Sequence, residues 1–326
     1  MPLQGIGEAG AKTFGTFRFD HPALALISWP YVSIRGAREG PTIGVTAGMH
    51  GSEYTGIEAA LRVAQALDPA DVGGHVLIIP VVNTPAFWGH AAHVVPLDGK
   101  NPSRTYPGRR DGTVSEVMAA HLFDEVFIHC DALIDLHSGD IMERLTPFTI
   151  YQESDDRELE ARARALAASY GFPAAVRRSK EVLRRPVPGY LAAAATLRGI
   201  PAIVAEAGGE GTLRETDVVA HVTGLRMALA HLGVTARVAG WLSAPEPRIV
   251  EFAFVFAPDD GVFSWSVDVG ARIAAGQRLG MLRDAWGRPV ADLSAPADGE
   301  MLFHSTSLAA RKGDLLFGIG VPIAGD

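Results

Sequence analysis

The chain has 326 residues, of which 48% are hydrophobic and 20% are charged, and its 29 basic and 37 acidic residues give a net charge of −8. This balance is typical of a globular enzyme, and no basic cluster marks a surface for nucleic acid or anionic membrane. The single cysteine, Cys130, excludes an intramolecular disulfide and a cysteine-rich zinc module. No apolar run approaches the roughly 20 residues of a membrane helix. The N-terminus lacks the profile of a secretory signal, so we expect a cytoplasmic protein.

Strands and helices alternate along the first 240 residues. Short β-branched runs predict strands, and apolar residues spaced i, i+3, i+4, i+7 predict helices. In chain order we predict a strand over 22–36 with Pro30 marking an edge, a strand over 42–48, a helix over 53–67, a strand over 75–83, a helix over 115–129, a strand over 132–138, helices over 155–170 and 189–198, a strand over 201–208 and a helix over 215–232. This alternation favours an α/β fold with a mostly parallel mixed sheet flanked by helices.

Residues 84–112 interrupt this pattern, because they carry Gly, Pro, Asn and Asp at high density without any period. A loop of this length inside a compact domain is usually functional or mobile.

The pattern changes near residue 240. From Glu246 onward no segment has the apolar spacing of a helix. The segments 267–282 and 306–320 resemble each other and have the pattern of two hairpin-like repeats. Such repeats predict a small all-β barrel or sandwich. We therefore expect a catalytic domain over residues 1–240 and a small β-domain over residues 241–326.

Two segments carry metal-binding side chains. His50 and Glu53, in Met-His-Gly-Ser-Glu, lie three residues apart at a predicted strand-to-helix turn, and His137 ends the strand over 132–138. Two histidines and one carboxylate form a catalytic zinc set that leaves a coordination position open. Each part has an alternative when it is taken alone. The spacing of His50 and Glu53 also arises by chance, and His137 could be an ordinary histidine of the core. Asp135, two residues before His137, either orients its imidazole or serves in a buried salt bridge or helix cap.

Glu206 ends the apolar strand over 201–208, just before a pair of glycines. A carboxylate at the end of a buried strand is a candidate general acid/base, because apolar surroundings raise its pKa. The alternative is a strand-end glutamate that faces solvent. Gly-x-Ser-x-Gly is absent from the sequence, and His129 and Cys130 are sequence neighbours whose side chains point apart, so a serine or cysteine nucleophile is disfavoured.

The order of these motifs resembles the succinylglutamate desuccinylase/aspartoacylase family. The matching segments, within about residues 40–235, are GMHGSE, a loop containing DGKNPSRTYPG, IDLHSG and GIPAIVAEAGG. The resemblance implies a zinc-carboxypeptidase-like fold that removes acyl groups from N-acyl amino acids, with a C-terminal β-domain of the barrel-sandwich type.

The resemblance also implies roles for individual residues. His50, Glu53 and His137 would bind one zinc ion, and Glu206 would activate water and protonate the leaving amine. Arg104 would hold a substrate carboxylate, although Ser103 replaces the asparagine that precedes this arginine in the family. His93 stands where the family has a further arginine, which polarises the scissile carbonyl. We therefore expect a pocket with less fixed positive charge than an aspartoacylase has, unless another arginine such as Arg184 or Arg185 enters it.

The sequence thus predicts a zinc-dependent hydrolase acting on an N-acyl amino acid or similar small amide, with no nucleic-acid or membrane partner. A homo-oligomer is compatible with this prediction. Two alternatives stay open: a metallocarboxypeptidase-like hydrolase of peptides or esters, and a non-catalytic protein that binds zinc or a small molecule.

Overall fold

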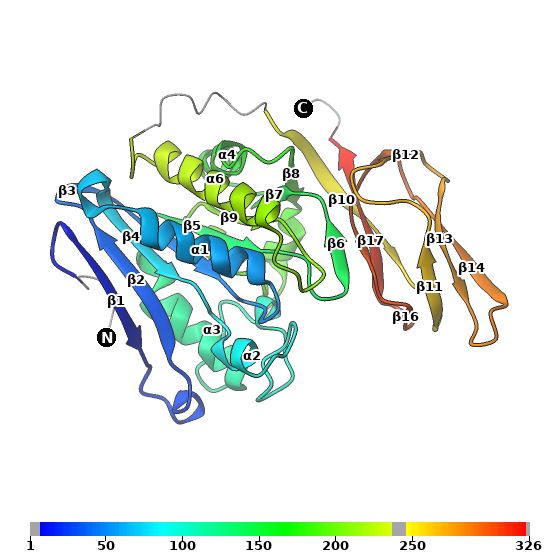
Figure 1. The fold of residues 1–326 in the computed structure, drawn as a ribbon, viewed down its shortest axis with the longest axis horizontal. Helices are drawn as coiled ribbons and strands as arrows, with labels where there is room; N and C mark the ends of the chain where they lie inside the picture. The colour runs from blue at the N-terminus through cyan, green and yellow to red at the C-terminus, as the bar shows by residue number, and fades with distance from the viewer. Residues whose placement is uncertain (1–6, 237–245, 324–326) are drawn as a thin grey trace.

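The computed structural model describes residues 7–236 and 246–323, and Figure 1 shows a long twisted sheet with helices on both faces. Its six α-helices within these residues are α1 (Tyr54–Ala66), α2 (Thr84–Trp88), α3 (Val114–Glu125), α4 (Arg157–Ser169), α5 (Leu191–Thr196) and α6 (Glu215–His231). None of the helices in the described ranges is both long enough and apolar enough to cross a membrane.

The strands of the first part of the chain are β1 (Ala11–Phe17), β2 (Trp29–Arg35), β3 (Arg38–Ala47), β4 (Gly73–Ile79), β5 (Ala132–His137), β6 (Glu143–Leu145), β7 (Phe148–Gln152), β8 (Ala174–Arg178) and β9 (Ala202–Glu206). Those that follow are β10 (Arg248–Phe256), β11 (Gly261–Trp265), β12 (Arg272–Ile273), β13 (Arg278–Arg283), β14 (Pro289–Ser294), β15 (Gly299–Ser305), β16 (Ala309–Ala310) and β17 (Leu315–Pro322).

The large sheet has the order β1-β2-β4-β3-β5-β9-β7-β8-β10-β17-β15-β12 in the described part of the chain. Its centre is parallel, since β3 pairs in parallel with both β4 and β5, and β5 pairs in parallel with β9. Strand β7 runs antiparallel to β9, which makes the sheet mixed. The predicted α/β class with a mixed, helix-flanked sheet is therefore confirmed.

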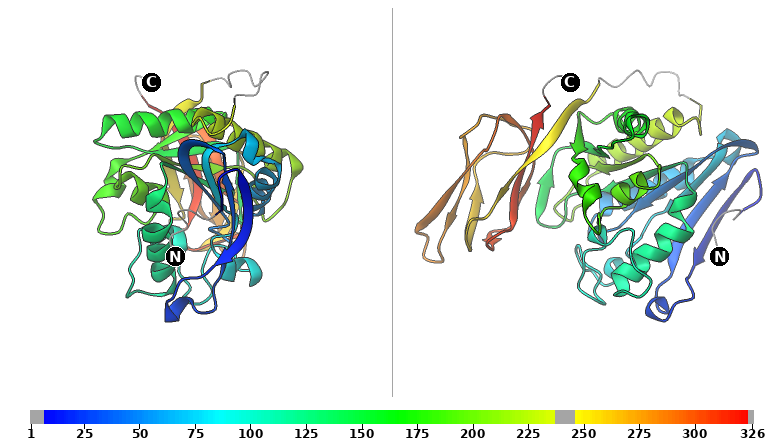
Figure 2. Two further views of the ribbon diagram at one scale, coloured as in Figure 1. Left: turned by 90° about the vertical axis from the view of Figure 1, so that its left-hand side faces the viewer. Right: turned by 180° about the vertical axis from the view of Figure 1, so that it is seen from behind.

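Each face of the sheet has its own apolar layer. On one face, β5 residues such as Ile134 and Leu136 pack with α1, α4 and α6. On the other face, Leu133 and Val204 pack with α3 and α5, and Figure 2 shows the molecule from behind, where α3 lies over this second face. Because side chains alternate along a strand, Asp135, His137 and Glu206 share the face covered by α3 and α5.

All five predicted helices are present, with each end within four residues of the predicted one, and three predicted strands are confirmed as β3, β5 and β9. The strand predicted over 22–36 begins only at Trp29, because Pro22–Leu24 forms a 3-10 turn capped by His21. The strand predicted over 75–83 ends at Ile79, immediately before Pro80.

The segment 84–112 was expected to be an unbroken loop, and this is wrong at two places. Helix α2 forms because Asn83 caps the amide of Ala86 and a proline occupies its first turn. A 3-10 turn, Pro102–Arg104, is capped in the same way by Asn101. Four further strands, β1, β6, β7 and β8, were not predicted; β6 has only three residues and β7 and β8 only five each.

The C-terminal strands form two packed layers. Strands β14, β13, β11 and β16 make a separate antiparallel sheet, whereas β10, β17, β15 and β12 extend the large sheet through the parallel pair β8–β10. A small core that includes Phe263, Leu282 and Phe317 joins the two layers, at the right of Figure 1. The expected all-β sandwich is thus present. The boundary expected at residue 240 lies outside the described residues and stays a prediction.

Candidate active site

His50, Glu53 and His137 meet at the carboxyl edge of β3 and β5. One ligand atom from each lies within 4.8 Å of the other two. The Glu53 carboxylate lies between the imidazoles, with Oε1 2.5 Å from Nδ1 of His50 and Oε2 2.9 Å from Nδ1 of His137. Glu53 and His137 are buried, whereas the His50 side chain keeps 12% of its surface exposed. The cluster is therefore open to solvent on the His50 side and could hold a metal ion.

The turn between β3 and α1 is tight because glycines stand where a side chain would clash. Gly48 adopts φ +62°, and a Cβ on Gly51 would lie 2.6 Å from the backbone of both Ala86 and Ala91. The Gly51 amide donates to the carbonyl of Ala92, which fixes the loop after α2 beside the turn. This backbone places His50 just before α1 and Glu53 at the helix N-terminus.

A second layer of polar side chains orients both imidazoles. Nε2 of His137 lies 3.0 Å from the Asp135 carboxylate, which also accepts from Thr46 on the neighbouring strand. Nε2 of His50 lies 3.1 Å from Oδ1 of Asn101. Such partners fix the tautomer and direction of an imidazole, so that the Nδ1 atoms face Glu53. The sequence suggested Asp135, but Asn101 was missed, because 51 residues of chain separate it from His50.

Electrostatics within the cluster follow from burial and pairing. Burial opposes ionisation of Glu53, but the two imidazoles lower its pKa to about 2. Burial likewise opposes a charge on His137, yet Asp135 and Glu53 raise its pKa well above the usual range. Behind this pair, His221 is buried with its Nε2 2.9 Å from the carbonyl of His137, and burial lowers its pKa to about 4. His221 is therefore neutral, and its Nε2–H donates a hydrogen bond to the carbonyl of His137.

Glu206 lies beside His137, since the two residues are register partners on β9 and β5. Burial raises the pKa of the Glu206 carboxyl well above its usual range, while the nearby His137 charge lowers it. Glu143 on β6 interacts electrostatically with the same groups; its own pKa is raised to about 8 by burial and by the charges of Glu53 and Asp140. Nothing in the sequence marked Glu143, because β6 is too short to be predicted.

The three predicted substrate residues lie on the segment between α2 and α3. Nδ1 of His93 is 2.9 Å from Asp140, whose other oxygen accepts from Ser52. The bond to Asp140 raises the pKa of His93. Ser103 is buried, and its hydroxyl has no hydrogen-bond partner among the described residues. Arg104 is exposed, and one guanidinium nitrogen donates to the Ser103 carbonyl.

A further arginine, Arg178 at the end of β8, lies close to this group. Its guanidinium carbon is 3.9 Å from the ring centre of Tyr190, and that of Arg104 is 4.6 Å from the same ring. The sequence pointed instead to Arg184 or Arg185; Arg184 is largely exposed and pairs with Glu181. No pattern in the sequence marks Arg178, because β8 has only five residues and ends in two adjacent arginines, of which Arg177 pairs with Glu251 instead.

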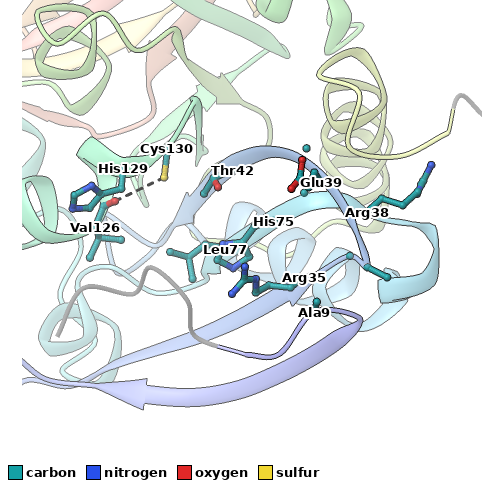
Figure 3. Close-up of a pocket in the computed structure, with 14 residues that line it drawn as sticks. Ala9, Arg35, Arg38, Glu39, Thr42, His75, Leu77, Val126, His129 and Cys130 are labelled. Carbon is teal, nitrogen blue, oxygen red and sulfur yellow. Dashed lines mark hydrogen bonds between the residues drawn. The ribbon is translucent and has the colours of Figure 1, made fainter.

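A cavity of about 610 Å³ lies at the opposite edge of the sheet and is lined by Thr42, His75 and Cys130, among others, as Figure 3 shows. It sits at the amino ends of β3, β4 and β5, whereas the metal-ligand cluster sits at their carboxyl ends. The Cys130 thiol contacts the carbonyl of Val126, and burial raises its pKa to about 12. Cys130 is therefore not an activated nucleophile.

Comparison with known proteins identifies a family and a related enzyme. A sequence model of the succinylglutamate desuccinylase/aspartoacylase catalytic domain matches residues 39–232. The chain is 30% identical over 305 residues to an N-alpha-acetyl-L-2,4-diaminobutyric acid deacetylase from Halomonas elongata, covering 91% of this chain and 86% of that protein.

Solved structures of similar shape cover nearly the whole chain. The product-bound ectoine utilization protein EutE (DoeB) from Ruegeria pomeroyi superposes with a TM-score of 0.85 at 26% identity, covering 98% of both chains. A succinylglutamate desuccinylase/aspartoacylase from Rhodobacter sphaeroides superposes with a TM-score of 0.84 at 26% identity, covering 96% of both.

The state of Cys130 gives a first testable prediction. Because its thiol is buried with a pKa of about 12, native protein should react with iodoacetamide at least about 100-fold more slowly than protein unfolded in urea. Mass spectrometry of the alkylated chain at pH 8 measures both rates. Similar rates would show that Cys130 is accessible and would reopen the case for a thiol nucleophile.

Proposed function

Since the chain belongs to the succinylglutamate desuccinylase/aspartoacylase family, we propose that it is a cytoplasmic zinc-dependent hydrolase that removes the acyl group from an N-acyl amino acid. The observation that carries the proposal is the meeting of His50, Glu53 and His137 at one sheet edge, with Glu206 on the adjacent strand. We also propose that the catalytic domain ends at residue 240, where the β-domain begins, and that the protein can form a homo-oligomer.

The donor set fits zinc. Two imidazole nitrogens and one carboxylate are the ligands of many catalytic zinc sites, and the Asp135 and Asn101 contacts supply the outer hydrogen bonds that such ligands need. When bound there, zinc would polarise the scissile carbonyl and acidify a water molecule.

The remaining steps fall to the chain's own side chains. Glu206, with a pKa raised by burial, takes a proton from the attacking water and delivers it to the departing amine. Arg104 binds the substrate carboxylate through charge-assisted hydrogen bonds, which holds the amide in place. The bond to Asp140 raises the pKa of His93 and favours its protonated form, and the imidazole of His93 can donate a hydrogen bond that stabilises negative charge on the acyl oxygen.

The relatives suggest the substrate class, since one is named a deacetylase of N-alpha-acetyl-L-2,4-diaminobutyric acid. That compound carries one carboxylate and one free ammonium group. Glu143 lies near the metal-ligand cluster, where burial and the charges of Glu53 and Asp140 raise its pKa to about 8. An ammonium group of the substrate beside it would favour the ionised carboxylate and pair with it. We therefore propose N-acetylated amino acids with a neutral or cationic side chain as substrates, in preference to dianions such as N-acetylaspartate.

Metal content tests the ligand assignment. Wild-type protein should bind about one zinc per chain, and His50→Ala and His137→Ala should bind close to none, because each variant removes one of three ligands. Elemental analysis after dialysis against dilute zinc measures this content. His93→Ala is the matched control, since His93 bonds Asp140 rather than Glu53, and it should retain zinc. Full occupancy in both ligand variants would contradict the assignment.

Acetate release tests the reaction itself. Zinc-loaded wild type should deacetylate Nα-acetyl-L-2,4-diaminobutyrate with a higher kcat/KM than N-acetylaspartate. Glu206→Gln should keep its zinc and lose roughly 10²–10⁴-fold in kcat, the usual effect of removing a general acid/base.

Glu210→Gln serves as the control for this experiment, because Glu210 lies four residues further on and pairs with Arg144 and Arg214. It should turn over at nearly the wild-type rate. Turnover of C-terminal peptide bonds in place of N-acetyl groups would favour a metallocarboxypeptidase. Zinc binding without turnover of any amide or ester would favour a non-catalytic binding protein.

A further inference from the structure

Arg178 is a half-buried cation at the end of β8. Its Nη1 atom is buried and has no hydrogen-bond partner within residues 7–236 and 246–323. In the same residues no carboxylate lies within salt-bridge distance of Arg178 or of Arg104. A guanidinium group has five N–H donors in a fixed planar fork, and leaving a buried nitrogen of that fork without an acceptor is costly. The protein therefore holds Arg178 ready for a ligand that it does not itself supply.

The surroundings of Arg178 show which ligand fits. Arg178 and Arg104 both lie against the ring of Tyr190, at 3.9 and 4.6 Å from its centre. Burial, together with the like charge of Arg104, lowers the pKa of Arg178 to about 10, so it remains charged at neutral pH. Glu206 is among the carboxylates that interact electrostatically with it. Arg178 is thus a cation near the proposed general base, with a second cation at the same ring, and an anion of the substrate would pair with it.

We infer that Arg178 is a second binding residue for the carboxylate end of the substrate, acting beside Arg104 at the Tyr190 ring. This inference rests on the proposed function, because it assumes an N-acyl amino acid in this site. A carboxylate matches the planar fork of a guanidinium with two parallel hydrogen bonds, and it satisfies the buried donors that the chain leaves open. Arg178 thereby selects substrates that carry a free carboxylate over their uncharged analogues.

The fold explains how a residue this far along the chain reaches the site. Strand β8 runs parallel to β7, and Arg178 is its last residue, paired in register with Gln152. Arg177, one residue earlier, points to the other face and pairs with Glu251 at 2.6 Å. Adjacent arginines of one strand thus have different roles, and this provides a matched control.

The test compares two probes on the same proteins. Nα-acetyl-L-2,4-diaminobutyrate and its carboxamide are titrated calorimetrically into Glu206→Gln protein, which should bind without turnover, with and without Arg178→Gln. We expect Arg178→Gln to weaken binding of the acid about 10- to 100-fold, the scale of a lost charge-assisted hydrogen bond. Binding of the carboxamide should change less than about 3-fold, and Arg177→Gln should bind both probes as its parent does.

Steady-state kinetics of the Arg178 variants, with Glu206 intact, provide a second test. Arg178→Gln should raise KM for the acid with a smaller effect on kcat, and Arg178→Lys should recover part of the loss because it restores the charge without the fork. Equal weakening of acid and carboxamide would assign Arg178 a packing role against Tyr190 and overturn the inference. The inference would also be overturned if Arg178→Gln bound the acid as tightly as its parent does, or if none of the proteins bound the acid. Failure of the proposed function would look different: binding of the acid would depend on Arg178, but the wild type would release no acetate.

Discussion

The carboxylate of Glu53 holds the site together. It lies between His50 and His137 at the edge of the sheet and is itself buried. An unpaired carboxylate in such a place would cost several kcal/mol, so the two imidazoles and the backbone amide of Ser138, 3.2 Å away, are needed for its burial. In return, the carboxylate fixes the direction of both imidazoles. The position of the turn after β3, the start of α1 and the end of β5 all follow from this arrangement.

The parallel centre of the sheet then determines what surrounds the cluster. Parallel strands end at one edge, and side chains in register share a face. Thr46 is therefore the register partner of Asp135, and Glu206 is the register partner of His137, so that these side chains lie beside the cluster on three neighbouring strands. The segment between α2 and α3 runs beside the cluster, where Asn101 contacts His50 and where His93 and Arg104 lie nearby. Rigid strands supply the proposed ligand His137 and the proposed base, and the loop supplies groups for the substrate.

Sequence patterns predicted the parts of the site that lie at the ends of strands. His50, Glu53, His137 and Glu206 stand next to strongly apolar runs, and a buried apolar run that stops at a polar residue marks a sheet edge. The same patterns could not reveal contacts made across the fold. Asn101, Glu143 and Arg178 are ordinary polar residues in a loop or in short strands, and only the tertiary structure brings them to the cluster. The helices inside 84–112 were missed for a local reason, since Asn and Pro begin short helices as readily as they mark loops.

If the chemistry occurs where His50, Glu53 and His137 meet, zinc should bind there. Anomalous diffraction at the zinc absorption edge, from crystals of the zinc-loaded protein, measures its position directly. We expect one strong peak in each chain, enclosed by these three side chains and adjacent to Glu206. A peak elsewhere in the molecule, with the three side chains still bonded only to one another, would contradict it.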